Sequence, residues 1–155
     1  MTQDISSILF ICTGNTARSP LAEYLARYYA KEYNLNISFS SAGFINAFSY
    51  MQPESRKYLS TKGINHSNFR PQLISKRLIK NYDLIITMET SHKRDILREY
   101  SAINNLNEKV FTLKEYIGEG GNLDIQDPYY TSNEQYREIA AEIDKYLRRG
   151  IILKM

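Results

Sequence analysis

Ser7–Pro20, S-I-L-F-I-C-T-G-N-T-A-R-S-P, joins a short apolar run to a polar loop that ends at a proline. The continuously apolar residues Ser7–Ile11 are typical of a strand buried in a parallel sheet. From Pro20 to about Tyr33, apolar side chains recur at helical spacing, and proline is favoured in the first turn of a helix. The stretch therefore predicts a buried strand, a tight loop and a helix in direct succession.

The same order of strand and helix recurs along the rest of the chain. The expected further strands are Ile37–Ser41, Tyr82–Met88 and Lys109–Leu113, and the expected further helices are Gln52–Lys62, Ser91–Tyr100 and Asn133–Arg149. Gly63 and Gly150 follow two of these helices, where glycine commonly ends a helix. The alternation predicts an α/β fold, with a four-stranded parallel sheet and helices on both faces. We expect residues 1–155 to form one domain, with its ligand site at the carboxyl ends of the strands.

The composition is that of an ordinary globular protein. The 155 residues are 43% hydrophobic and 24% charged, which suits one domain with a sizeable core. A net charge of +3 without a basic tract favours no nucleic-acid partner. No apolar run approaches the roughly 18 residues of a membrane span. One cysteine excludes an internal disulfide, so we expect a protein of the reducing cytoplasm. We also expect a monomer.

The loop Cys12–Pro20 has the residues of an anion site. Because it follows a strand and opens a helix, backbone N–H groups and the positive end of the helix dipole should point into it. A cysteine at the mouth of such a loop favours the thiolate, which is a nucleophile. Arg18 can hold two phosphate oxygens in a fork, in line with the Cys12 sulfur. Cys12 alone suggests a buried structural cysteine, but Arg18 followed by Ser19 favours catalysis.

The remaining loop residues suit the same role. Gly14 and Asn15 tolerate the left-handed backbone that a tight loop needs. The Ser19 hydroxyl is placed to hydrogen-bond the sulfur, which favours the thiolate and eases its departure. The predicted phosphate-binding residues beside Arg18 are Thr13, Gly14, Asn15, Thr16, Ala17 and Ser19.

A second segment, Asp127-Pro128-Tyr129-Tyr130, follows the last predicted strand. It should therefore lie at the same edge of the sheet as Cys12. Phosphate transfer needs a proton for the leaving group and then a base for water, and one carboxyl group can do both. On its own, Asp-Pro is equally consistent with a surface turn. If Asp127 is the acid, Tyr129 and Tyr130 are expected to wall the cleft and stack on an aromatic ring.

The loop C-T-G-N-T-A-R-S-P resembles the signature of the low-molecular-weight protein tyrosine phosphatases. The similarity extends to Ser41-Ala42-Gly43, Leu84–Met88, Val110–Leu113 and Asp127-Pro128-Tyr129-Tyr130. The resemblance implies a phosphorylated protein as substrate, a phosphocysteine intermediate on Cys12 and inorganic phosphate as product. It also implies that Arg18 binds the phosphate and that Asp127 is the general acid and base. It implies no cofactor or metal, and no His, Cys and carboxylate cluster suggests one.

A network that braces the loop in this family is only partly matched. Asn15, Ser19 and Ser41 occupy three of its positions. The fourth, usually a histidine, falls on Asn68, with His66 two residues earlier. We expect either an amide brace from Asn68 or a register that is shifted by two residues. His66, like His92, is otherwise expected to be solvated.

Two departures concern oxidation and specificity. Ala17 stands where many members have a second cysteine, so no disulfide can protect an oxidised Cys12. At position 16 the chain resembles the phosphoarginine phosphatase branch, which has Thr there. Phosphotyrosine enzymes of the family usually have an aliphatic residue at this position. Tyr129-Tyr130 instead resembles the phosphotyrosine branch. The two markers disagree, and we expect phosphotyrosine, with phosphoarginine as the alternative.

Other functional classes fit the sequence less well. Arsenate reductases with this loop pass electrons through additional cysteines, and this chain has one. The phosphocysteine carriers of sugar uptake need neither Arg18 nor an Asp-Pro acid. A non-catalytic phosphoprotein-binding module is expected to have lost Cys12, Arg18 or Asp127. A dinucleotide-binding domain needs G-x-G-x-x-G after its first strand, which this sequence lacks.

Overall fold

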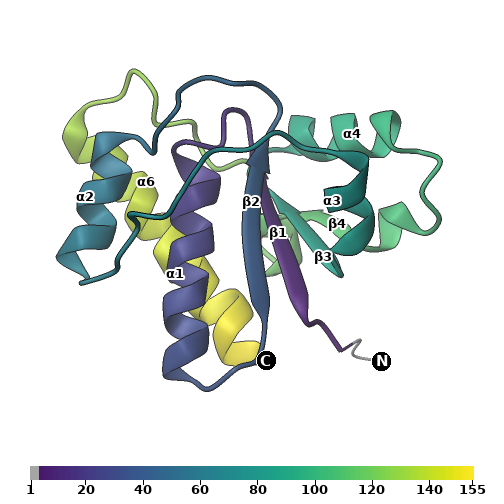
Figure 1. Cartoon of the computed structure of the whole chain (residues 1–155), viewed down its shortest axis with the longest axis horizontal. Coiled ribbons are helices and arrows are strands. Elements are labelled where there is room, and N and C mark those ends of the chain that lie inside the picture. The colour runs from purple at the N-terminus through teal and green to yellow at the C-terminus, as the bar shows by residue number, and fades with distance from the viewer. Residues whose placement is uncertain (1–3) are drawn as a thin grey trace.

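A sheet of four parallel strands runs through the centre of the structure (Figure 1), a computed structural model that describes residues 4–155. β1 (Ser7–Cys12) pairs with β2 (Ser38–Gly43) on one side and with β3 (Leu84–Thr87) on the other. β4 (Val110–Thr112) pairs with β3, so the order is β2-β1-β3-β4. Since the chain leaves β1 toward β2 and returns to β3 on its other side, a crevice opens at the carboxyl end of β1. The predicted α/β class and four-stranded parallel sheet are confirmed.

Three helices cover one face of the sheet (Figure 1). α1 (Arg18–Glu32), α2 (Pro53–Thr61) and α6 (Asn133–Lys145) pack against one another there. Their apolar side chains share a core with Ile8 and Phe10 of β1, which are fully buried. This layer therefore anchors the helix that follows the predicted anion loop.

The opposite face is covered by α3 (Lys76–Asn81) and α4 (Thr90–Glu99) (Figure 1). Leu9 and Ile11 of β1 point into this second core. Successive side chains of a strand point to opposite faces, so a central strand covered on both sides is apolar at every position. This explains why the apolar run of β1 is uninterrupted.

Several short helical segments complete the structure. They are η1 (Leu106–Glu108), α5 (Leu113–Tyr116), η2 (Tyr146–Ile151, a π-helix) and η3 (Ile152–Lys154). Neither α3 nor α5 is predicted by the sequence pattern, because a few residues show no apolar period. Local caps form them instead. The Ser75 hydroxyl accepts from the Leu78 N–H at the start of α3, and Thr112 and Glu115 form a capping box at α5.

The boundaries around the loop differ from the prediction in a way that matters for the site. α1 begins at Arg18, two residues before Pro20, so Arg18 and Ser19 belong to its first turn. β2 continues to Gly43, beyond the predicted end at Ser41, and so reaches the loop.

The expectation that Gly150 ends the last helix is wrong. The helical backbone continues through η2 to Ile151. A Cβ atom at Gly150 would lie 2.8 Å from the Cβ of Ile117, so glycine is needed there for close packing. Because it has no side chain, Gly150 allows close contact with the segment after α5, and it does not end the helix.

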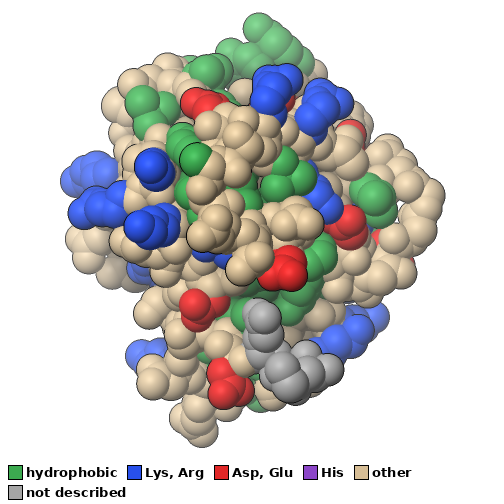
Figure 2. Space-filling model, turned by 90° about the vertical axis from the view of Figure 1, so that its right-hand side faces the viewer, with side chains coloured by type: hydrophobic (Ala, Val, Ile, Leu, Met, Phe, Trp, Pro, Cys, Tyr) green, Lys and Arg blue, Asp and Glu red, His purple; other side chains and the backbone are tan. Residues whose placement is uncertain are grey.

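Charge is dispersed on the face shown in Figure 2. Lys and Arg side chains form separate groups there, and acidic side chains lie between them. None of the helices within residues 4–155 has the length and apolar character needed to cross a membrane.

Gly43 provides a first test, because it touches the backbone of the loop. An added Cβ would lie 2.7 Å from the Asn15 nitrogen and 2.9 Å from the Thr13 oxygen. Gly43→Ala should therefore displace the loop, lower the free energy of unfolding by about 1–3 kcal/mol and weaken phosphate binding. Urea unfolding and phosphate titration calorimetry measure both effects. Gly120→Ala is the matched control, since its Cβ would meet nothing within 4 Å. Equal behaviour of the two variants would contradict the prediction.

Candidate active site

Backbone hydrogen bonds hold the loop between β1 and α1 in place. α1 begins directly after it, so the first-turn N–H groups, which have no partners within the helix, are directed toward the loop. Asn15 has a φ of +55°, the left-handed conformation that the sequence predicts there. The segment after β2 closes the loop from outside. The Thr13 carbonyl accepts from the Phe44 N–H at 2.7 Å, and the Thr16 carbonyl accepts from the Gln52 N–H at 2.8 Å.

Cys12 lies at the end of β1, and its residue is 2% exposed. Its Sγ is 2.9 Å from Ser19 Oγ, so the predicted hydrogen bond is present. Asn15 Nδ2 donates to the same Ser19 oxygen at 2.9 Å, and Asn15 Oδ1 accepts from the Gln72 N–H at 2.9 Å. Because Ser19 already accepts from an amide, its own proton is directed to the sulfur. The arrangement thus directs a hydrogen-bond donor to the Cys12 sulfur.

Arg18 is almost fully buried, with one edge of its guanidinium occupied. Nη1 donates to Glu89 Oε2 at 2.6 Å and to the Ile125 carbonyl at 2.7 Å. Nη2 donates a long hydrogen bond to Thr13 Oγ1 at 3.5 Å and lies 3.8 Å from Asp127 Oδ2. Nε is buried and has no hydrogen-bond partner within residues 4–155. An unpaired buried donor costs about 1–3 kcal/mol, so the Nε–Nη2 edge is suited to two oxygens of an anion.

His92 supports the loop from behind, and the expectation that it is solvated is wrong. The residue is 4% exposed, and its Nε2 is 3.0 Å from Thr13 Oγ1. Its ring stacks on Phe44 at a centroid distance of 5.5 Å. Burial lowers the pKa of His92 to about 4, against an opposing effect of Glu89. The imidazole is therefore neutral at physiological pH. The α4 turn that carries His92 faces the back of the loop, which sequence spacing alone does not reveal.

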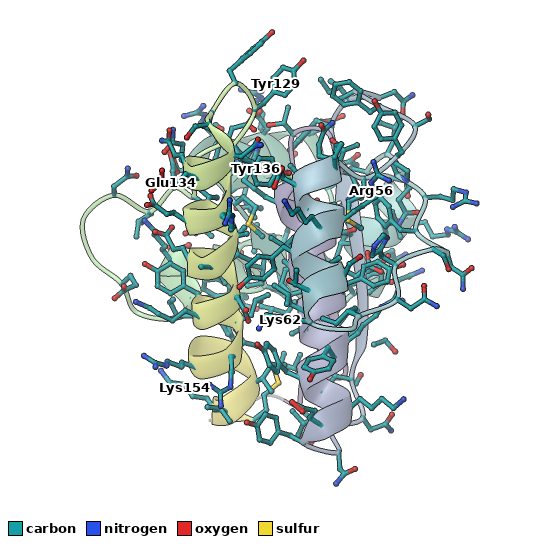
Figure 3. The ribbon with its side chains drawn as sticks, turned by 90° about the vertical axis from the view of Figure 1, so that its left-hand side faces the viewer. Arg56, Lys62, Tyr129, Glu134, Tyr136 and Lys154 are labelled. Atoms are coloured by element: carbon teal, nitrogen blue, oxygen red, sulfur yellow. The ribbon has the colours of Figure 1, made fainter. Side chains whose placement is uncertain are left out.

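A pocket of about 310 Å³ opens over the loop. Cys12 and Arg18 lie at its floor, and its apolar walls are Ile45, Ala47, Phe48, Tyr129 and Tyr136. Tyr136 projects between α6 and α2, and Tyr129 lies above it on the loop before α6 (Figure 3). The phenyl rings of Phe48 and Tyr129 are 5.9 Å apart between centroids. The pocket thus joins a polar floor to a largely aromatic rim.

Asp127 lies at the mouth of the same pocket. Its side chain is 49% exposed, and Oδ1 accepts from the Tyr129 N–H at 3.1 Å. The structure therefore brings together Cys12, Arg18 and Asp127, as the sequence predicts. No three His, Cys, Asp or Glu side chains in the described part of the chain are arranged to hold a metal ion. The site offers a sulfur nucleophile, an oxyanion cradle and a carboxyl group.

Known proteins share this arrangement of sequence and fold. The model of the family described as low molecular weight phosphotyrosine protein phosphatase matches residues 7–151. The chain belongs to this family.

Relatives of this phosphatase carry two kinds of name. A Bacillus subtilis protein named protein-arginine-phosphatase is 34% identical over 143 residues, which cover 92% of each chain. A Staphylococcus haemolyticus protein named low molecular weight protein-tyrosine-phosphatase PtpB is 34% identical over 84% of this chain and 87% of its own. The crystal structure of a low molecular weight protein tyrosine phosphatase from T. tengcongensis matches with a TM-score of 0.86 and 32% identity, over 97% of this chain and 99% of that one. The chain is thus a cysteine-dependent protein phosphatase that acts on phosphorylated proteins.

Two predicted positions of the phosphatase site need correction. Asn68 is exposed and, among residues 4–155, forms no side-chain hydrogen bond with the loop. The backbone N–H of Gln72 takes that place, because the irregular segment before α3 presents its main chain to Asn15. Ser41 is buried but donates to Glu23 of α1 at 2.6 Å, so it supports the helix and not the loop directly. Burial raises the pKa of that Glu23 carboxyl.

The two tyrosines after Asp127 also differ from the prediction. Tyr129 lines the pocket, whereas Tyr130 is 93% exposed and is not among the lining residues of the described pocket. Tyr130 has a φ of +70°, and its ring is tilted by 51° against the ring of Tyr129, with centroids 4.2 Å apart. The left-handed backbone turns its side chain away from the cleft. Of the pair, Tyr129 alone is placed to contact a substrate bound in the pocket.

Sequence reasoning missed Glu89 and Tyr136 altogether. Glu89 follows β3 at the carboxyl edge of the sheet. An acidic residue at this edge can pair with Arg18, so its position could have identified it as a site residue. Tyr136 lies on the pocket-facing side of α6, where its apolar spacing predicts only a core residue.

The buried, neutral His92 predicts a loss of stability in acid. A histidine in the unfolded chain takes up a proton near pH 6.5, but folded His92 does so only near pH 4. The unfolded state therefore binds more protons as the pH falls through this range, and the free energy of unfolding drops by up to about 3 kcal/mol.

The measurement is urea unfolding at a series of pH values between 7 and 4. His92→Gln should lose less stability than wild type over this range, because an amide accepts from Thr13 without titrating. His66→Gln is the matched control and should follow wild type. If His92→Gln loses as much free energy of unfolding as wild type between pH 7 and 4, His92 is not the source of the acid sensitivity.

Proposed function

We propose that this phosphatase hydrolyses phosphotyrosine in proteins through a phosphocysteine intermediate on Cys12. The observation that carries the proposal is the floor of the pocket, where the sulfur lies 2.9 Å from Ser19 Oγ and where the buried Nε of Arg18 has no hydrogen-bond partner among residues 4–155. Nε and Nη2 of Arg18 bind two oxygens of the phosphoryl group, and N–H groups of the loop bind the remaining one. This cradle aligns phosphorus with sulfur and meets the charge of the transition state.

The first step transfers the phosphoryl group to the enzyme. The Cys12 thiolate forms an S–P bond while the bond between phosphorus and the tyrosine oxygen breaks. Asp127, at the mouth of the pocket, gives its proton to the departing oxygen. This carboxyl group lies on the open side of the pocket, whereas the sulfur lies at its floor, as an in-line displacement requires.

The second step releases inorganic phosphate. The Asp127 carboxylate takes a proton from water, and the water oxygen attacks phosphorus as the S–P bond breaks. Ser19 donates its hydrogen bond to the departing thiolate, which restores the state before reaction. No redox partner or cofactor enters either step.

The walls of the pocket support an aromatic substrate. When the loop binds the phosphate of a phosphotyrosine, the tyrosyl ring extends between Phe48 and Tyr129. Stacked or edge-on aromatic contacts contribute about 0.5–1.5 kcal/mol beyond the buried area. Ile45 and Ala47 extend the apolar wall on the side of the segment after β2.

One observation favours phosphoarginine as a second candidate substrate. Thr16 is buried in the loop and lines the pocket, where its hydroxyl can accept from a guanidinium N–H. The B. subtilis relative named protein-arginine-phosphatase matches 92% of the chain. Both candidates use the same nucleophile and the same anion cradle, so they differ only in the group that leaves.

The specificity test compares kcat/KM on matched phosphotyrosine and phosphoarginine peptides. We expect at least a tenfold preference for phosphotyrosine, and no turnover of either by Cys12→Ser. Thr16→Ile should raise the preference by roughly five- to a hundredfold. The substitution leaves a guanidinium N–H of phosphoarginine without an acceptor, which costs about 1–3 kcal/mol. Thr61→Ile, at an exposed site of α2, is the control. A preference for phosphoarginine would establish the second candidate, and no turnover of either would contradict both.

The role of Asp127 is tested through the leaving group. Asp127→Ala should lose about 10²–10⁴-fold in phosphoenzyme formation from a phosphotyrosine peptide. It should lose much less from p-nitrophenyl phosphate, whose leaving group departs without a proton. Asp124→Ala is the control, because that carboxylate accepts from the Thr90 N–H at 2.7 Å and lies outside the pocket lining. Equal losses on both substrates in single-turnover kinetics would exclude Asp127 as the acid.

A further inference from the structure

Two hydroxyl groups connect the helix layer to the back of the phosphate loop. Ser55 of α2 is fully buried, and its Oγ donates to the Ala17 carbonyl at 3.1 Å. The Tyr136 hydroxyl of α6 lies 2.6 Å from the same Ser55 Oγ. Figure 3 shows Tyr136 projecting from α6 toward α2. Three segments that are distant in sequence thus meet in one chain of hydrogen bonds.

The direction of the protons in this chain follows from the groups themselves. The Ala17 carbonyl can only accept, so the single proton of Ser55 is directed to it. The Tyr136 hydroxyl must then donate to Ser55. Burial raises the pKa of Tyr136 to about 12, so this hydroxyl keeps its proton at neutral pH. The order Tyr136 to Ser55 to Ala17 is therefore fixed.

The Ala17 carbonyl belongs to the last peptide before α1. Ala17 has φ −121° and ψ −76°, away from the regular helical region, so this peptide is not oriented by the helix alone. In a trans peptide the C=O and N–H bonds point in opposite directions. A carbonyl held on the helix side therefore directs the Arg18 N–H into the loop. Hydrogen bonds in series also polarise one another, which makes that N–H a stronger donor.

We propose that Tyr136 and Ser55 are positioning residues that hold the Arg18 N–H against the phosphoryl group. The inference rests on the proposed role of the loop as the phosphate cradle. It assigns to Tyr136 a second role beside its ring, which forms part of the pocket wall. The effect is largest in the transition state, where the charge on the equatorial phosphoryl oxygens is best met by donors that are already oriented.

Tyr136→Phe removes one oxygen and keeps the wall. We expect kcat to fall about tenfold with KM changed by less than about twofold. The affinity for vanadate, which adopts the geometry of the transition state in such sites, should fall in parallel with kcat. Tyr29→Phe is the matched control. It removes another phenol from the same helix layer, one that donates to Asp144 at 2.5 Å, and should leave kcat and vanadate affinity unchanged.

A double-mutant cycle separates positioning from general packing. Ser55→Ala should lower kcat and vanadate affinity about as much as Tyr136→Phe, and the double variant should be no worse than Ser55→Ala, because the two hydroxyls act in series. Additive losses, or a Tyr136→Phe enzyme that loses thermal stability but keeps kcat and vanadate affinity within twofold, would overturn the inference. Vanadate affinity measured by calorimetry needs no turnover, so the inference is decided even if wild type hydrolyses neither phosphopeptide and the proposed function fails.

Discussion

The buried positive charge of Arg18 is the constraint on which the rest of the site depends. Arg18 as a residue is 1% exposed, so its guanidinium has lost most of its water, which is costly unless acceptors and negative charge replace it. Glu89 and the Ile125 carbonyl do so on one edge, at 2.6 and 2.7 Å. This requirement brings the segment after β3 and the segment before Asp127 to the same point. On the opposite edge Nε has no hydrogen-bond partner among residues 4–155, which suits that edge to an oxyanion.

The loop around that charge is braced from separate elements. Gly43 of β2 contacts its backbone, His92 of α4 meets the Thr13 hydroxyl, and Ser55 of α2 holds the Ala17 carbonyl. Donors fixed in this way need no reorganisation when charge develops on a substrate. Because each brace belongs to a different element, the pocket floor is tied to the whole domain. The site therefore depends on the tertiary structure and not on the loop sequence alone.

This dependence also explains what could be predicted. The succession of strand, loop and helix in Ser7–Pro20 could be predicted because the three are consecutive in sequence, although α1 begins at Arg18 and not at Pro20. The Asp127 position followed from the rule that parallel strands end at one edge. The brace at Gln72 could not be predicted, since a main-chain N–H leaves no trace in residue type and the segment before α3 has no period from which Asn68 could be placed. His92 was misjudged for a related reason: a histidine's burial depends on which turn of α4 faces the loop.

Floor and rim have different tasks, and the difference bears on the choice of substrate. In the proposed reaction the floor binds the phosphoryl group, which phosphotyrosine and phosphoarginine share. A phenyl ring and a planar guanidinium can both lie against Phe48 and Tyr129, so stacking separates them poorly. Only the guanidinium needs acceptors, and each unpaired N–H costs about 1–3 kcal/mol. Thr16 and Asp127 offer acceptors near the phosphorus, whereas the hydrocarbon walls Ile45, Ala47 and Phe48 offer none. The ring meets no such cost anywhere along the pocket, and this asymmetry is the physical reason to place phosphotyrosine first.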